Sequence, residues 1–143
     1  MFVSAHHAPQ IPNPEPGIYQ LPEPEFVEKL RCLNGTSDQV LKNSDLMALM
    51  LPTLRADFTI CGTYQYADDA PLDCPISAFG GMQDPLAHHD QLVAWREQTS
   101  ADFSLRMIPG GHFFIHTSQP LLLWAISQEL RQWLAQPELA RCW

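Results

Sequence analysis

Apolar residues recur with the period of an α-helix through the first half of the chain. Residues 25–33 show this pattern and run into an Asn-Gly pair, which is typical of a helix C-terminus. Polar residues that favour helix N-caps then begin a short helix over residues 36–42 and a longer one over residues 44–66. Pro52 lies inside the longer pattern and predicts a kink or a new start there. The apolar stripe of the longer helix comprises Met47, Met50, Leu51, Leu54, Phe58 and Cys61.

The second half of the chain alternates between strand and helix patterns. Residues 74–79 and 103–108 are short apolar runs with strand character, whereas residues 86–98 and 120–135 have helical spacing. This alternation predicts parallel strands with helices packed on the sheet, which is an α/β fold. The residues expected to face inward are Leu92, Val93 and Trp95 in the first helix, Phe103, Leu105 and Met107 on one face of the second strand, and Leu123, Ile126, Leu130, Trp133 and Leu134 in the second helix.

A further strand is predicted at residues 1–4, which form a very short apolar run. Residues 8–24 contain six prolines, so this stretch is expected to be an extended surface connection outside any sheet or helix. Two or three strands make a small sheet, whereas buried parallel strands need neighbours on both sides. With 143 residues and 16.2 kDa, residues 1–143 are expected to form one domain of ordinary size or a piece of a larger one, and the small number of strands favours a single partial α/β domain.

The chain is acidic, with 8 basic residues, 16 acidic residues and a net charge of −8. This charge repels phosphate backbones and anionic lipid, so neither nucleic acid nor a membrane is expected as a partner. No apolar run approaches the ~20 residues of a spanning helix, and residues 1–10 lack the features of a secretory signal. The cysteines show no CxxC spacing, which indicates reduced thiols in a cytoplasmic protein. These four residues are Cys32, Cys61, Cys74 and Cys142.

The candidate chemistry lies in the loops that follow the two strands of the second half. Asp84 comes just after the first of these strands and His112 just after the second, and both loops contain glycines that permit tight turns. Ligands bind at the carboxyl ends of the strands in α/β sheets. Adjacent loops can bring the carboxylate to the imidazole, fixing its tautomer and stabilising its positive form. The alternative is that Asp84 is a turn residue before a proline and that His112 is structural.

Other residues that could bind a metal or react as nucleophiles give weaker signals. The histidine pairs at 6–7 and 88–89 lack an identified third ligand, so neither a metal nor a cofactor is predicted. Cys74 opens a strand and is interpreted as a buried thiol, which makes it a poor substitute nucleophile. The tryptophans are interpreted as helix-packing residues because the acidic balance of the chain disfavours base stacking.

Several longer segments together resemble one family. LMLPTLRADF, CPISAFGGMQDP, LVAWREQT and FSLRMIPGGHFFIH, in this order, are similar to type II thioesterases of nonribosomal peptide and polyketide synthetase systems. The resemblance runs through nearly the whole chain and includes FVSAHHAPQIPNP and NGTSDQVLKN. It implies an incomplete α/β-hydrolase fold, with the C-terminal strands and helices and a helical lid but without the N-terminal strands and the nucleophile elbow.

The same resemblance implies an activity and a partner. Type II thioesterases hydrolyse acyl or aminoacyl groups from the phosphopantetheine arm of a carrier protein, and they do so without a cofactor. By this resemblance Asp84 matches the acid of a Ser-His-Asp triad and His112 matches its base. Residues 25–66 match a mobile helical lid over the acyl site, although core packing is expected to account for most of its apolar stripe.

The sequence departs from the family at the nucleophile. The family's serine sits in a G-x-S-x-G elbow, and that motif does not occur here. Ser4 lies after the elbow in chain order and lacks flanking glycines, so it is not nominated. We expect this chain alone to have little or no thioesterase activity unless a separate N-terminal half supplies the nucleophile. The alternatives are a non-catalytic module that binds carrier proteins and a degenerate remnant that folds poorly.

Overall fold

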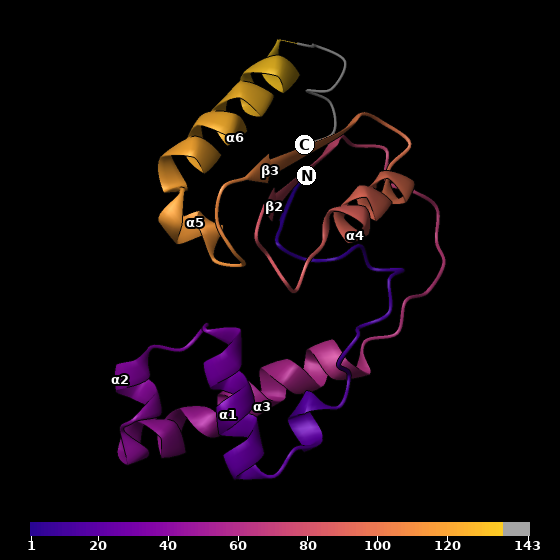
Figure 1. Ribbon diagram of the computed structural model, residues 1–143. Coiled ribbons are helices and arrows are strands. Elements are labelled where there is room, and N and C mark those ends of the chain that lie inside the picture. The colour runs from indigo at the N-terminus through magenta and orange to yellow at the C-terminus, as the bar shows by residue number, and fades with distance from the viewer. Residues whose placement is uncertain (136–143) are drawn as a thin grey trace. The chain divides into compact units, whose positions relative to one another are not determined.

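The computed structural model describes residues 1–135 and divides the chain into two compact units (Figure 1). One unit comprises Met1–Ile11 and Ala67–Trp143, and the other comprises Pro12–Tyr66. Each unit has a hydrophobic core of its own, so each is described by itself. The predicted thiol of Cys142 lies outside the described residues.

The first unit is built on a three-stranded parallel sheet in the order β1-β2-β3. The strands are β1 (Phe2–Ser4), β2 (Ile76–Gly81) and β3 (Phe103–Ile108). Phe2 lies opposite Ser77, and each residue of β2 lies opposite a residue of β3 from the first position onward. The parallel α/β arrangement predicted from the alternating pattern is therefore confirmed.

Helices cover both faces of this sheet (Figure 1). One face is covered by α4 (His89–Val93) and the 3-10 helix η2 (Ala94–Gln98). Leu92 of α4 is fully buried there, and its methyl group lies 2.2 Å from where a Cβ on Gly80 would stand. Only a glycine in β2 lets α4 approach this closely. The sequence predicted one regular helix over 86–98 with Val93 inward, but the second half is a 3-10 turn and Val93 is exposed.

The opposite face is covered by α5 (Phe114–Thr117) and α6 (Gln119–Leu134). The two helices meet the sheet through a buried apolar cluster, and the ring of Phe2 stacks on Trp133 with centroids 4.7 Å apart. Successive residues of a strand point to opposite faces, so Phe79 faces α6 and Gly80 faces α4. The buried cluster consists of Phe79, Ile108, Phe114 and Ala125.

The buried side of α6 differs from the predicted stripe. Leu123, Leu130 and Leu134 are exposed, whereas Glu129 is only 4% exposed. Its carboxylate accepts two hydrogen bonds from the Arg106 guanidinium, at 3.0 and 3.1 Å. A buried charge is tolerated when it is paired in this way. The buried face of α6 therefore includes a paired carboxylate, which the apolar pattern did not predict.

This ion pair sets a first prediction. Arg106→Met leaves the buried carboxylate of Glu129 without its charged partner, and we expect the free energy of unfolding to fall by about 1–3 kcal/mol in urea denaturation. The double variant Arg106→Met/Glu129→Met removes both charges and should recover most of that loss. Arg96→Met, at an exposed position of η2, is the control. A double variant as unstable as the single one would contradict this account of the pair.

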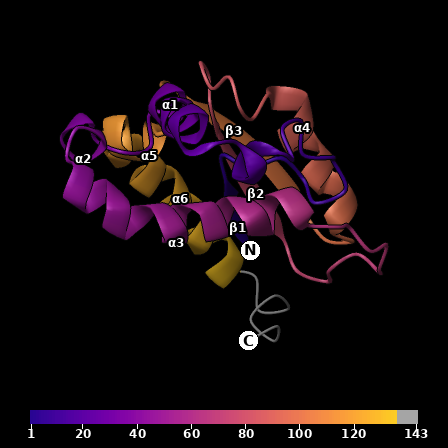
Figure 2. The ribbon, with the colours of Figure 1, turned by 90° about the horizontal axis from the view of Figure 1, so that it is seen from below.

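The second unit is helical. It contains the 3-10 helix η1 (Ile18–Gln20), α1 (Glu23–Leu33), α2 (Asp38–Leu41) and α3 (Ser44–Thr63) (Figures 1 and 2). Asn34 ends α1 in the left-handed conformation, as the Asn-Gly pair predicts. The buried core of this unit consists of Phe26, Leu30, Leu41 and Met47.

Three details of this unit correct the sequence predictions. The α3 N-cap is Asn43, whose side-chain oxygen accepts from two backbone amides, so Ser44 is the first helical residue. The helix continues through Pro52 without a new start and ends at Thr63. The first turn of α1 includes Pro24, which the predicted extended connection over residues 8–24 had placed outside any helix. Proline is compatible with a first turn because those amides have no intrahelical acceptor.

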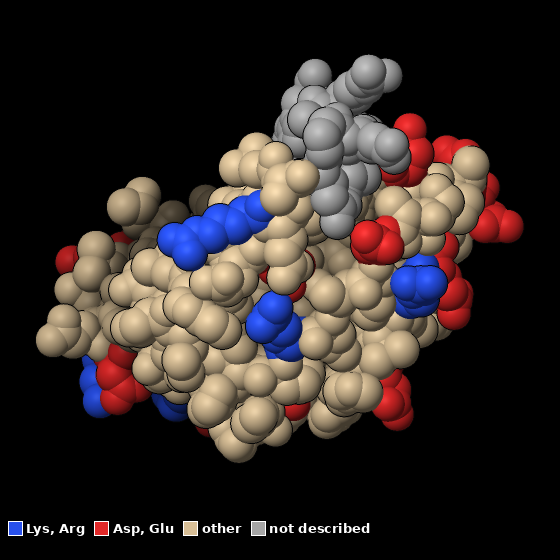
Figure 3. Space-filling view, turned by 90° about the horizontal axis from the view of Figure 1, so that it is seen from above, with Lys and Arg blue, Asp and Glu red and all other residues tan. Residues whose placement is uncertain are grey.

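On the face in Figure 3, the lysine and arginine side chains of the described residues lie apart from one another, and some lie beside acidic side chains. Over residues 1–135, no helix has the combination of length and apolar character that crossing a membrane requires.

Candidate active site

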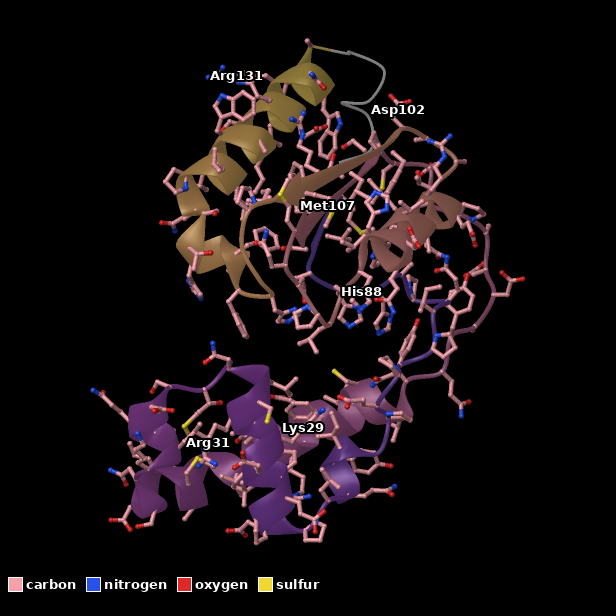
Figure 4. All side chains as sticks on the ribbon, viewed as in Figure 1. Lys29, Arg31, His88, Asp102, Met107 and Arg131 are labelled. Atoms are coloured by element: carbon pink, nitrogen blue, oxygen red, sulfur yellow. The ribbon has the colours of Figure 1, made fainter. Side chains whose placement is uncertain are left out.

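The loops after β2 and β3 lie side by side at the carboxyl ends of the strands. In Figure 4, His88 marks this end of the sheet, Asp102 marks the opposite end, and Met107 lies between them. Two backbone hydrogen bonds tie the loops together: Met82 N–H donates to Ile108 at 2.9 Å, and Gln83 N–H donates to Gly110 at 2.9 Å. The second loop is therefore positioned directly by the first.

Glycines make this approach possible. A Cβ on Gly81 would stand 2.3 Å from the carbonyl oxygen of Gly111 and 2.6 Å from that of Gly110, both of which are rigid backbone atoms. Gly110 has a φ of +127°, a conformation that other residues rarely adopt. The amide of Gly110 also donates to the side chain of Gln83 at 2.8 Å.

Within this frame the structure brings together the two residues that the sequence singled out. His112 Nδ1 lies 3.0 Å from Asp84 Oδ2. The other carboxylate oxygen, Oδ1, accepts from the amides of Leu86 at 2.8 Å and Ala87 at 3.2 Å. The Asp84 side chain is fully buried, whereas 28% of the His112 side chain is exposed. Asp84 is thus held in one orientation by its own loop, and it holds the histidine in turn.

The hydrogen bond determines the chemistry left on the imidazole. An ionised carboxylate only accepts, so the bond places a proton on Nδ1 of His112 and leaves Nε2 able to take another. The ring of Phe113 meets the imidazole edge-on, with centroids 5.0 Å apart, and further restricts its orientation. A histidine oriented by a buried carboxylate is suited to general-base and general-acid work.

A glycine substitution tests the geometry. Gly81→Ala forces the loops apart, and we expect it to lower the free energy of unfolding by about 1–3 kcal/mol through overpacking. The same shift should weaken the proton signal of His112 Nδ1 in NMR spectra. Gly111→Ala is the matched control, since its Cβ would meet nothing closer than 3.7 Å. Equal stability and an unchanged imidazole signal in Gly81→Ala would contradict the close approach of the loops.

The remaining candidates lie elsewhere. Cys74 comes before β2, at the end of the sheet opposite His112, and Ser4 is exposed at the end of β1. Among residues 1–135, no group of three potential ligands could hold a metal ion. Sequence reasoning did not identify a pocket of about 300 Å³ beside Asp84, because its lining combines residues of β2, β3, the loop after β2 and the start of α4. These residues are Gly81, Met82, Asp84, Ala87, His88, His89, Asp90 and Met107.

A parallel sheet covered by helices on both faces, with an acid and a histidine in contact at adjacent strand ends, is the arrangement of the α/β-hydrolase fold. The sequence profile of the thioesterase domain matches residues 1–130. The chain therefore belongs to the thioesterase domain family.

Individual relatives support this placement. The gramicidin S biosynthesis protein GrsT of Aneurinibacillus migulanus is 47% identical over 135 residues, which cover 94% of this chain and 53% of that protein. The RedJ thioesterase of the prodiginine pathway in Streptomyces coelicolor is 34% identical, with a TM-score of 0.81, over 90% of this chain and 51% of that one. BorB, a type II thioesterase from the borrelidin cluster, is 34% identical with a TM-score of 0.76, over 90% and 53%. The chain thus spans about half the length of these relatives.

Proposed function

We propose that residues 1–143 supply the base and the orienting acid of a type II thioesterase that hydrolyses acyl thioesters on a carrier protein. The observation that carries the proposal is the 3.0 Å contact between Asp84 Oδ2 and His112 Nδ1 at the carboxyl ends of two parallel strands. The nucleophilic serine and the oxyanion-hole amides are proposed to come from a segment outside these residues, because the chain has no G-x-S-x-G.

In this proposal His112 moves the proton in both half-reactions. Its Nε2 takes the serine proton as the serine oxygen attacks the thioester carbonyl, and it then protonates the departing pantetheine thiolate as the C–S bond breaks. In the second half-reaction, Nε2 takes a proton from water, and the water oxygen attacks the acyl-serine. That proton returns to the serine oxygen as the carboxylic acid leaves. Asp84 keeps its hydrogen bond to Nδ1 and stabilises the imidazolium at each stage.

The partner is proposed to be an acyl or peptidyl carrier protein bearing phosphopantetheine. The relatives' names place them in gramicidin S, prodiginine and borrelidin biosynthesis, and thioesters in such pathways are held on carrier arms. The acidic composition of this chain argues against a polyanionic partner.

We also propose that residues 25–66 act as a lid over the acyl chain. They fall within a separate compact unit, and their long helix α3 exposes large apolar side chains that a plain core helix would bury. The exposed set includes Leu46, Leu49, Met50 and Ile60. An acyl chain is a suitable apolar ligand for such a surface.

The test uses a fused chain, in which the residues of the Aneurinibacillus relative outside the matched segment are joined ahead of Met1. This fused chain should hydrolyse an acyl-pantetheine thioester, as measured by release of free thiol. No hydrolysis by a folded fused chain would count against the proposal.

A second candidate is a module that binds carrier proteins without chemistry, and the absent G-x-S-x-G motif favours it. Binding of an acylated carrier by residues 1–143, together with a fused chain that never turns over substrate, would support that candidate.

A further inference from the structure

The residue Gln83 joins the loop of Asp84 to the loop of His112. Its side-chain Oε1 accepts the amide N–H of Gly110 at 2.8 Å, and its own backbone N–H donates to the Gly110 carbonyl at 2.9 Å. Gln83 directly precedes Asp84, and Gly110 lies two residues before His112. Both backbone polar groups of one residue in the second loop are therefore held by one residue in the first.

A second side chain holds the same peptide group from its other end. The peptide between Pro109 and Gly110 directs its N–H to Gln83 and its carbonyl to the Ser118 hydroxyl, which donates at 2.6 Å. Ser118 is the N-cap residue of α6, so its contact ties the loop to that helix. Of these two side-chain contacts, only the one with Gln83 relates the peptide to the loop of the acid.

The conformation of Gly110 explains why these contacts are needed. Its φ of +127° is open to glycine, which has more accessible backbone conformations than any other residue. Hydrogen bonds to both its amide and its carbonyl select one of these conformations. A rotation at Gly110 would displace the imidazole of His112, and a misplacement of about 1 Å at a reacting group can lower a rate by about 100-fold.

We propose that Gln83 is a positioning residue, whose side-chain oxygen fixes the approach of His112 to Asp84 and thereby the tautomer of the imidazole. The alternative is that the exposed glutamine only adds a surface hydrogen bond to the stability of the fold. The structural part of the proposal concerns residues 1–143 alone, and only its kinetic consequence rests on the proposed function.

The first test is made on residues 1–143 without substrate. Gln83→Met keeps the length of the side chain and removes the acceptor, whereas Gln83→Glu keeps an acceptor oxygen. Nitrogen NMR of the His112 imidazole, at a pH where the ring is neutral, gives the ratio of the Nδ1-protonated to the Nε2-protonated tautomer. We expect this ratio to fall at least about threefold in Gln83→Met and to stay within about twofold of the wild-type value in Gln83→Glu.

The matched control is Gln132→Met, which makes the same replacement at an exposed position of α6. It should leave the tautomer ratio within about twofold. Folding of every variant is verified by circular dichroism and urea denaturation. A Gln83→Met variant that loses stability but keeps the wild-type tautomer ratio would overturn the inference, because the role of Gln83 would then be structural only. Equal losses in Gln83→Glu and Gln83→Met would also overturn it.

The second test measures thioester hydrolysis by the fused chain. Gln83→Met should lower kcat at least about tenfold and leave KM within about twofold, because the residue acts through His112 rather than on the substrate. Gln83→Glu should recover kcat to within about threefold of wild type. A rise in KM at unchanged kcat would overturn the inference. A fused chain that hydrolyses nothing, while the tautomer ratio changes as expected, would count against the proposed function alone.

Discussion

In the fused chain, His112→Ala lowers kcat for acyl-pantetheine hydrolysis by about 10⁴–10⁶-fold. The imidazole is the only group placed to take the serine proton in the proposed mechanism, and its Nε2 is available because Asp84 holds the other nitrogen at 3.0 Å. The rate is measured as thiol release at saturating substrate, so that a change in binding does not mask the change in chemistry.

Asp84→Asn tests the contribution of the carboxylate to the same Asp84–His112 pair. An amide preserves the shape but favours the wrong tautomer of His112, and a loss of about 10⁴-fold in kcat is expected. His6→Ala, an exposed histidine of the same unit, is the control and should leave the rate within about twofold. A His112→Ala enzyme that keeps a tenth or more of the wild-type rate would remove His112 from the mechanism.

Residues 1–143 alone should hydrolyse the same thioester no faster than buffer does. Without a serine nucleophile the rate is expected to fall by about 10⁶-fold, and each missing oxyanion-hole donor costs about a further 10²–10³-fold. The comparison is made at equal concentrations of this chain and the fused chain, with folding of both verified by circular dichroism. Hydrolysis by the short chain that is lost in His112→Ala would show that a residue within 1–143 is the nucleophile.

The parallel α/β arrangement could be predicted from the sequence because its signals are local. The runs at 74–79 and 103–108 are separated by a helical pattern, and a parallel crossover is the usual result. The contact between Asp84 and His112 is a consequence of the same topology, since both residues follow strands that end at one edge. Their proximity could be expected from the sequence. The tight packing at Gly81, where a Cβ would stand 2.3 Å from the Gly111 carbonyl oxygen, could not.

The buried face of α6 could not be predicted, for a physical reason. Periodicity treats every leucine as inward and every carboxylate as outward, but Glu129 is buried because Arg106 on β3 neutralises it. The pairing depends on two elements that are distant in sequence. Leu123 lines a groove and is 56% exposed, so the apolar stripe of α6 does not coincide with its buried face.

The N-cap of α3 and the effect of its internal proline also could not be predicted from single residues. Asn43 and Ser44 are both good N-caps, and the backbone geometry selected the first. Pro52 lies inside α3, whereas its position in the helical pattern predicts a kink or a new start there.

The measurement that tests the central claim most directly is the location of the acyl group on the fused chain. The chain is mixed with an acyl-pantetheine, quenched within the first turnover, digested and analysed by mass spectrometry. We expect the acyl group on a serine outside residues 1–143 and a rate of acylation that collapses in His112→Ala. An acyl group attached within residues 1–143, or acylation that proceeds equally fast without the imidazole, would contradict the account.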